Sequence, residues 1–293
     1  MSNVKLNTLP VPTYPWLGVN DTQRELAEID VQTVALTEPK TSIDISSDSA
    51  FEITADGGDS KSAVMFIGAD QSAQIKTSVD VKQGSSVKLV QVFESKAQTV
   101  ASVSAKLEDS AQFELVQLYL GTADTVSEID TVLSGRKSEF TANIGYLLGG
   151  DDKLDINLNA KHLGRKTKSS ITAKGVMDGA SSKIFKGTID FVNGSAGAVG
   201  AENEDVLLIG DKVINKTVPL ILCAEEDVEG SHGASIGRVD EAHIFYMQSR
   251  GIPDEKIAQL MAQSKIAQIV GTIGDEQTQS RINSTLGRGN EDE

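Results

Sequence analysis

The sequence predicts a mainly β protein: a right-handed parallel β-helix with a short N-terminal arm and a C-terminal α-helical cap. Short runs that alternate between apolar and polar residues fill the middle of the chain and are separated by small or acidic turns. Aromatic residues make up only 4% of the 293 residues, fewer than a β-sandwich core of this length usually holds. Sustained helical periodicity occurs only near the C-terminus. Together these features favour a β-solenoid that ends in helices.

Residues 1–37 are expected to form an N-terminal arm that docks on the core. Three prolines bracket the aromatic residues Tyr14 and Trp16. Asp21 then precedes a short helical pattern over residues 24–29. The arm is therefore expected to contain one short helix.

Residues 38–237 are expected to form the β-helix core. Residues 63–67, 87–93 and 113–120 are typical of its strands, and no window in this region keeps a 3.6-residue period for three turns. The interior of a narrow coil suits Val, Ile, Leu, Ala and Ser, which are the residues that these runs supply. With ~20 to 25 residues per coil, the region would form roughly eight coils.

Residues 238–287 are expected to form a helical domain that caps the C-terminal end of the solenoid. One helix is predicted over residues 240–250, and a second begins after Pro253, with acidic residues in its first turn. A third is predicted over residues 275–286. The charged tail, 288–293, is expected to be disordered.

Charge and hydropathy exclude several classes of function. With 27 Lys and Arg against 42 Asp and Glu, the net charge is −15, which opposes binding to nucleic acid. The longest strictly apolar stretch, 218–224, is far shorter than the roughly 20 residues that cross a bilayer. Since the N-terminus also carries no apolar signal core, we expect a cytoplasmic protein that does not span a membrane.

Two side chains stand out as candidate metal ligands. Cys223, the single cysteine, ends an apolar run, and His232 follows nine residues later. A lone cysteine is more often a packed small hydrophobe, and a histidine beside glycine is more often a turn residue. Together, however, a thiol and an imidazole suit iron or copper. Since one cysteine cannot supply a four-thiolate site, any cluster would need ligands from a partner.

An enzymatic alternative starts from the acidic residues. Paired carboxylates on a β-helix would suggest cleavage of polysaccharides, and the candidates are either Glu202, Glu204 and Asp205 or Glu225, Glu226 and Asp227. Most such clusters are solvated turns, and the expected absence of export argues against a secreted enzyme. The chain also contains no phosphate-binding loop.

Residues 231–241 (SHGASIGRVDE) and 244–252 (IFYMQSRGI) closely resemble the C-terminal signature of the SufB/SufD family of iron–sulfur cluster assembly proteins. Further similarity lies in residues 9–10, 16–20, 181–189 and 207–210. The resemblance implies a β-helix flanked by helical regions and a scaffold subunit that is not itself an enzyme. It also implies three kinds of partner: a SufB-like subunit or a second copy of the chain, the ABC-type ATPase SufC, and apo-proteins that accept the cluster.

The resemblance also implies roles for individual residues. The signature histidine of the family falls on His232, which is expected to serve a transient iron–sulfur cluster at the interface between two scaffold subunits, with Cys223 as an additional ligand. Glu204 stands where SufB proteins carry a cysteine, and Ser231 and Gly233 flank the histidine where SufB proteins have glutamates. These departures point to the SufD type and leave open whether the chain itself holds the cluster.

In the family, the C-terminal helices are where the ATPase docks. The resemblance therefore assigns ATPase binding to Phe245, Tyr246 and Arg250, although the two rings could instead seal the last coil. Two scaffold subunits that join their strands edge to edge would also protect the exposed edges of the solenoid. A non-ligating subunit that only stabilises its partner remains an alternative, for which Glu204 and the single cysteine are the best support.

Overall fold

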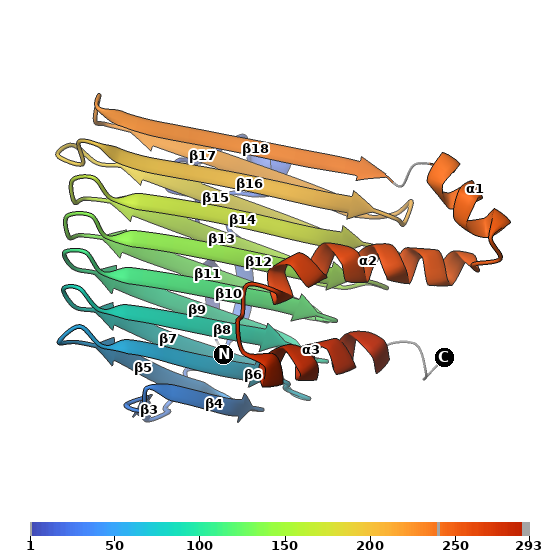
Figure 1. Ribbon diagram of the computed structural model, residues 1–293, viewed down its shortest axis with the longest axis horizontal. Coiled ribbons are helices and arrows are strands. Elements are labelled where there is room, and N and C mark those ends of the chain that lie inside the picture. The colour runs from blue at the N-terminus through green and yellow to red at the C-terminus, as the bar shows by residue number, and fades with distance from the viewer. Residues whose placement is uncertain (1, 239–240, 289–293) are drawn as a thin grey trace.

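Residues 2–238 and 241–288 are described by the computed structural model, and they form a parallel β-solenoid with C-terminal helices (Figure 1). The even-numbered strands from β4 onward form one eight-stranded sheet in the order β18-β16-β14-β12-β10-β8-β6-β4. The odd-numbered strands from β3 onward form the facing sheet in the order β17-β15-β13-β11-β9-β7-β5-β3. The chain thus crosses from one sheet to the other at every turn. This arrangement confirms the predicted parallel solenoid.

The solenoid strands follow one another along the chain as β3 (Thr33–Ala35), β4 (Lys40–Ile45), β5 (Ser49–Ala55), β6 (Ser60–Ile67), β7 (Ala73–Val81), β8 (Ser86–Phe93), β9 (Gln98–Leu107), β10 (Gln112–Leu120), β11 (Asp124–Leu133), β12 (Glu139–Leu148), β13 (Lys153–His162), β14 (Lys168–Met177), β15 (Ser182–Phe191), β16 (Ala198–Leu208), β17 (Ile214–Cys223) and β18 (Val228–Arg238).

Each coil is longer than the sequence predicts. Gln112 pairs with Ser86, 26 residues before it, and Ile214 pairs with Ser182, 32 residues before it. The longer repeat follows from the strands, since β16 and β18 each have 11 residues. As a result the region forms about seven coils instead of eight.

The interior between the two sheets is filled by apolar side chains from both of them. Aromatic residues are few, but most of them lie there. The Phe93 and Tyr119 rings stack 4.6 Å apart, and Phe113 stacks on Phe140 at 5.5 Å. Burying each such side chain stabilises the fold by roughly 1.5–3 kcal/mol.

The C-terminal helices are α1 (Glu241–Ser249), α2 (Asp254–Val270) and α3 (Glu276–Arg288). Instead of covering the last coil, α2 and α3 lie along the outer face of the even-numbered sheet (Figure 1). Strands β6, β8 and β10 carry buried apolar residues on both faces, so their outer face needs a cover. The helices provide this cover through Ile266, Ile269, Val270, Ile273 and Ile282. The predicted cap is therefore a lateral cover, and the last coil stays open.

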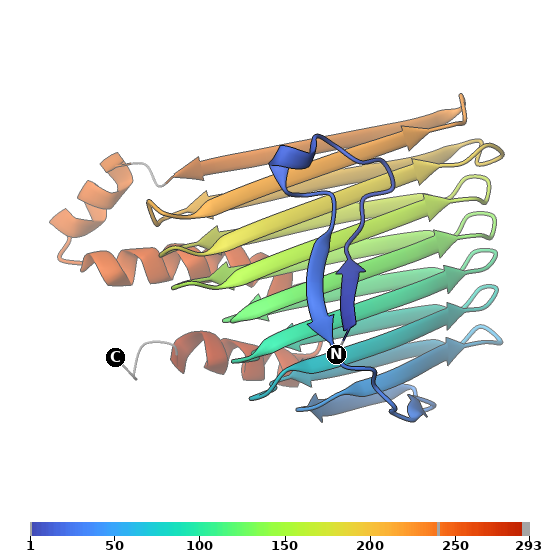
Figure 2. The same ribbon diagram turned by 180° about the vertical axis from the view of Figure 1, so that it is seen from behind.

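The N-terminal arm is a hairpin of β1 (Ser2–Leu6) and β2 (Thr22–Leu26), joined through a 3-10 turn, Pro15–Leu17. It lies across the outer face of the odd-numbered sheet (Figure 2). The prediction of a helix over residues 24–29 is wrong, because strand β2 extends to Leu26. Arg24 donates a hydrogen bond to Asp124 at 2.7 Å, and tertiary contacts of this kind outweigh a weak helical pattern.

Parts of the predicted C-terminal elements lie outside the described residues. These are residues 239–240, at the start of the first predicted helix, and residues 289–293 of the predicted tail. Among the helices that the structure describes, none has the length and hydropathy needed to cross a bilayer.

Candidate functional site

The candidate site is the open end of the solenoid, where β17 and β18 form the last coil. Side chains of β17 are mostly half-buried and those of β18 are mostly exposed, whereas β15 and β16 one coil earlier are largely buried. No described strand pairs with the outer edge of β17 or β18. The interior of the solenoid is therefore accessible from this end.

His232 points into the interior at this open end. Its neighbour in the sheet is Glu202, with which it is in register between β18 and β16. A Cβ on Gly230 would lie 3.0 Å from the Phe191 ring, which is part of the interior core, so Gly230 faces inward. Side chains two residues apart in a strand share a face, so the His232 imidazole faces inward as well.

Glu204 occupies the centre of a buried polar cluster one coil below the open end. Its carboxylate accepts hydrogen bonds from the Tyr146 hydroxyl at 2.9 Å and from the Thr217 hydroxyl at 2.6 Å. It also forms an ion pair with Lys183, whose side chain is fully buried. Both oxygens of Glu204 are thus engaged, so binding a metal would require these contacts to break.

The electrostatics of this cluster follow from its burial. Burial lowers the pKa of the Lys183 ammonium, and the Glu204 carboxylate opposes that shift. Burial, and then the negative charge of Glu204, raises the pKa of Tyr146 well above its usual value. The phenol therefore stays protonated and remains a hydrogen-bond donor to Glu204.

Glu202 lies next to this cluster, but no residue of the cluster forms a hydrogen bond with its Oε2 atom. The residue is 2% exposed, and its Oε2 atom has no hydrogen-bond partner among the residues that the structure describes. Burial, followed by the charge of Glu204, raises its pKa to about 7, while Lys183 lowers it. A Cβ on Gly187 would lie 2.2 Å from Oε2, so a larger residue at position 187 would displace this carboxylate.

Cys223 lies at the end of β17 and is exposed, and its thiol donates a hydrogen bond to the Glu225 carbonyl at 3.1 Å. Gly230 faces Ile221 across the last coil. Cys223 lies two residues beyond Ile221 toward the turn, and His232 lies two residues beyond Gly230 in the opposite direction. The two candidate ligands are thus separated by about four residues along the strands, or ~13 Å. The structure does not bring them together.

Of the three residues expected to bind an ATPase, Phe245 and Tyr246 lie in the middle of α1 and Arg250 directly follows the helix, outside the solenoid. Phe245 is 72% exposed and Tyr246 is 57% exposed, so neither ring seals the last coil. The Arg250 guanidinium lies 5.2 Å from the centre of the Tyr246 ring. The helix itself projects beyond the strand ends, next to α2 (Figure 1). Both rings are therefore available to a partner.

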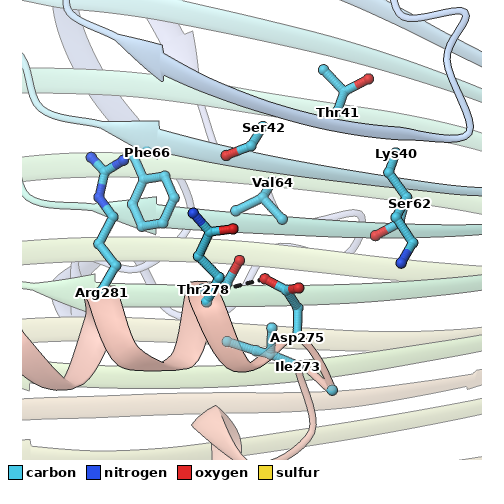
Figure 3. A pocket seen from close by; sticks show the side chains of 12 residues that line it. Lys40, Thr41, Ser42, Ser62, Val64, Phe66, Ile273, Asp275, Thr278 and Arg281 are labelled. Atoms are coloured by element: carbon cyan, nitrogen blue, oxygen red, sulfur yellow. Dashed lines mark hydrogen bonds between the residues drawn. The ribbon is translucent and has the colours of Figure 1, made fainter.

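A cavity of about 540 Å³ lies between α3 and strands β4 and β6 (Figure 3). Strand β4 is at the opposite edge of its sheet from β18, which carries His232. At the cavity, Arg281 covers the Phe66 ring and forms an ion pair with Asp44. Asp275 accepts a hydrogen bond from the Thr278 amide at 2.8 Å and so caps α3. These charged groups serve the packing of α3.

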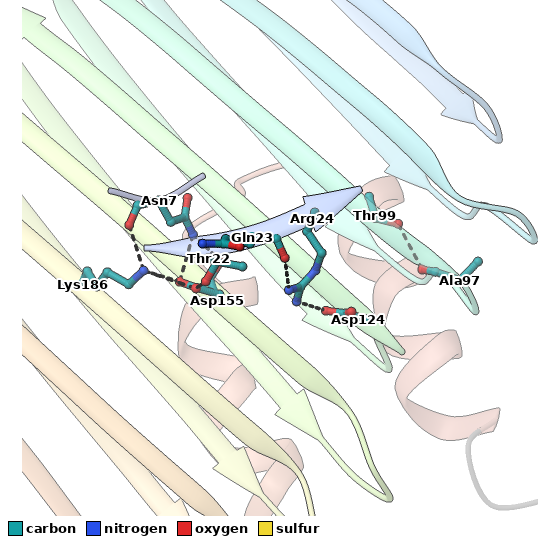
Figure 4. A network of polar contacts seen from close by, with 9 residues as sticks. All are labelled: Asn7, Thr22, Gln23, Arg24, Ala97, Thr99, Asp124, Asp155 and Lys186. Carbon is teal, nitrogen blue, oxygen red and sulfur yellow. Dashed lines mark hydrogen bonds and ion pairs between the residues drawn. The ribbon is translucent and has the colours of Figure 1, made fainter. Parts of the chain in front are cut away.

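A second buried polar network holds the N-terminal arm on the odd-numbered sheet (Figure 4). The Asn7 amide donates to Asp155 Oδ1 at 2.9 Å, and the fully buried Lys186 forms an ion pair with the same carboxylate at 3.0 Å. The Lys186 ammonium also donates to the Asn7 carbonyl. Since each of these residues has a partner within the network, its role is structural.

Sequence patterns found part of this site. The motif indicated His232 and Glu204, whereas Glu202 appeared only as one member of an acidic group. Lys183 appeared only within the family-like residues 181–189, and Tyr146 and Thr217 did not appear. The described residues contain no group of three or more His, Cys, Asp or Glu side chains placed to hold one metal ion. The strand alternation that turns Glu202 inward was the available signal.

Comparison with known proteins relates this geometry to a family. The model of the family "SUF system FeS cluster assembly, SufBD core domain" matches residues 39–265. The iron-sulfur cluster assembly protein SufD of Bacillus subtilis is 32% identical over 127 residues, which are 43% of this chain and 29% of the relative. SufD of Escherichia coli is 29% identical over 105 residues, 36% of this chain and 25% of the relative. The chloroplastic SufBD family protein ABCI8 of Arabidopsis thaliana is 31% identical over 115 residues, 39% of this chain and 21% of the relative.

Proposed function

The chain belongs to the SufBD family of iron–sulfur cluster assembly proteins, with similarity to the SufD type, and from this we propose that it is a scaffold subunit of a SUF assembly complex. In this role it pairs with a SufB-like subunit or a second copy of itself, binds a SufC-type ABC ATPase, and passes clusters to acceptor proteins. It works in the cytoplasm and catalyses no reaction of its own. The observation that carries the proposal is His232, which faces the interior at the open end of the solenoid.

Pairing at the open end is supported by the exposed edges of β17 and β18. Unpaired strand edges attract further strands, and a second scaffold subunit would cover them. Ile214 and Ile236 expose about half of their surface on these two strands. The arm adds to the same surface, because Lys216 of β17 donates a hydrogen bond to the Leu17 carbonyl at 2.7 Å and so keeps the exposed Trp16 beside the edge.

ATPase binding by α1 is supported by its exposed aromatic rings. Aromatic and arginine side chains are enriched where proteins bind one another, and Phe245, Tyr246 and Arg250 provide both kinds. Strand β18 ends at Arg238 and α1 begins at Glu241. When nucleotide-driven closure of two ATPase subunits moves α1, the displacement therefore acts on the strand that carries His232.

The proposal is tested by replacing His232 in the assembled complex. We expect His232→Ala to lower the iron and acid-labile sulfide that copurify anaerobically, since it removes an imidazole ligand at the open end. Ser231→Ala is the matched control, because Ser231 is exposed on the opposite face of the same strand. A His232→Ala complex that keeps its full complement of iron and sulfide would remove the ligand role.

A second candidate function is a non-ligating subunit that stabilises a cluster-binding partner. It is favoured by Glu204, which stands in place of a SufB cysteine and is engaged by Lys183. In this case His232→Ala would leave the cluster intact while the complex still forms. A polysaccharide-acting enzyme that uses Glu202 and Glu204 is not favoured, because both are buried inside the solenoid instead of lining a surface groove.

A further inference from the structure

The interior near the open end holds more negative than positive charge. Two carboxylates, Glu202 and Glu204, are each 2% exposed, and the ammonium of Lys183 is the single cation that contacts either of them among the described residues. That ammonium is committed to Glu204 and also donates a hydrogen bond to Thr217 at 3.2 Å. Glu202 therefore has no cation of its own among the described residues, and a buried carboxylate without a partner is unfavourable unless a cation balances it.

The Glu202 carboxylate is placed to meet such a cation. Its Oε2 atom is buried without a hydrogen-bond partner and occupies space that Gly187 leaves open. In the next strand toward the open end, His232 is in register with Glu202 and shares its inward face. Neighbouring strands lie about 4.8 Å apart. One ion at ~2.1 Å from an imidazole nitrogen and from a carboxylate oxygen can therefore be shared by the two side chains.

We propose that Glu202 and His232 together bind one Fe²⁺ ion just inside the open end of the solenoid, and that Glu204 is not a ligand but holds the neighbouring Lys183, Tyr146 and Thr217 in place. This inference rests on the proposed function for the identity of the metal. Imidazole and carboxylate donors suit Fe²⁺, and a dicationic ion supplies the charge that the interior lacks. Because this chain would provide only two donors, water or the second scaffold subunit would have to supply the other ligands.

Glu202 and Glu204 differ in the hydrogen bonds and ion pairs that their carboxylates already form. Glu204 accepts from Tyr146 and Thr217 and pairs with Lys183, so its oxygens are saturated. Glu202 keeps an oxygen available. Cys223 does not join the site, because it lies ~13 Å from His232 along the strands.

The test is an anaerobic titration of the full-length protein with Fe²⁺ at pH 7.5, together with Co²⁺ as an absorption probe of the ligand set. The variants are Glu202→Gln, which keeps the shape of the side chain, Glu202→Asp, which keeps its charge, and His232→Asn. The matched control is Glu229→Gln, since Glu229 is exposed on the outward face of β18, three residues from His232. Unfolding curves establish that each variant is folded.

We expect Glu202→Gln and His232→Asn each to weaken Fe²⁺ binding at least about tenfold and to change the Co²⁺ spectrum. Glu202→Asp should have a smaller effect, and Glu229→Gln should bind as the wild type does. Wild-type affinity in Glu202→Gln would overturn the assignment of Glu202. If His232→Asn alone lost binding, the inference would fail while the proposed function stood. A wild-type protein that binds no Fe²⁺ would overturn the inference and favour the non-ligating subunit.

Discussion

Among single residues, Glu202 indicates a functional role most clearly, because burying its carboxylate lowers the stability of the folded protein. Its pKa is raised from 4.5 to about 7, so the folded protein holds a proton that the unfolded chain releases between those values. Stability is therefore lost as the pH rises through this window, by up to about 3 kcal/mol. In metal-free buffer, Glu202→Gln should be more stable than the wild type at pH 8 and equally stable below pH 4.5.

Urea unfolding at pH 4.5 and pH 8 measures this difference, with Glu229→Gln as the control. Because the glutamine cannot ionise, its advantage should grow between the two pH values. A Glu202→Gln variant that is less stable than the wild type at pH 8 would show that the carboxylate is satisfied in a way the structure does not record.

His162, in another part of the interior, is expected to give the opposite pH dependence of the free energy of unfolding. It is fully buried between the Thr167 hydroxyl at 2.7 Å and the Ser169 hydroxyl at 2.9 Å, and burial lowers its pKa to about 4. The unfolded chain binds a proton near pH 6.5 while the folded protein does not, so His162 costs stability as the pH falls from 6.5 to 4. The loss reaches up to about 3 kcal/mol.

Replacing this residue separates its contribution from all other titrating groups. The stability of His162→Gln, measured by urea unfolding, should decline less steeply than that of the wild type between pH 6.5 and pH 4. Equal slopes for the two proteins would contradict a neutral, buried imidazole.

The sequence indicated His232 as a candidate ligand but gave no reason to single out Glu202. His232 sits in a motif, whereas the significance of Glu202 depends on three features that lie apart in the chain. These features are Gly187 opposite the carboxylate, Lys183, which already forms an ion pair with Glu204, and His232 one coil later. Such relationships arise only when the coil length is known, and the coils proved longer than predicted.

Among the elements, the position of α2 explains how the helices are attached. Ile269 of α2 is 2% exposed and belongs to the apolar cluster formed with β6, β8 and β10. Ile269→Glu would bury an unpaired carboxylate there, which costs several kcal/mol. We expect α2 and α3 to detach while the solenoid, which has its own interior core, stays folded.

Limited proteolysis followed by mass spectrometry tests this expectation. Ile269→Glu should be cleaved within residues 251–275 at least about tenfold faster than the wild type. Leu260→Glu is the matched control, because Leu260 lies on the same helix but is exposed. Equal cleavage of Ile269→Glu and the wild type would contradict the lateral packing of α2.

Strands were predictable because alternation is a local signal, but the location of the helices was not. In β8, Leu89, Val90, Val92 and Phe93 are all buried, so this strand is apolar on both faces. That pattern indicates a covered outer face, but it does not say which segment provides the cover. The helix predicted in the N-terminal arm was wrong for a similar reason. Residues 22–26 become a strand through contacts with Asp155 and Asp124, which are more than 90 residues away.

For the whole molecule, the open end predicts association. Introducing charge at the edges of β17 and β18, with Ile214→Lys and Ile236→Lys together, should weaken pairing with the second scaffold subunit at least about tenfold. Sedimentation analysis of the complex measures the change. Leu163→Lys is the control, since Leu163 is also partly exposed but lies in the turn after β13. Unchanged association in the double variant would place the pairing surface elsewhere.

The scaffold role itself is tested most directly by anaerobic affinity purification of the full-length protein from its own host. Mass spectrometry would identify the copurifying proteins, and the eluate would be assayed for iron and acid-labile sulfide. Our account predicts an ABC-type ATPase, a SufBD-type subunit or a second copy of the chain, and both iron and sulfide. A protein purified without an ATPase, without a scaffold partner and without iron or sulfide would contradict it.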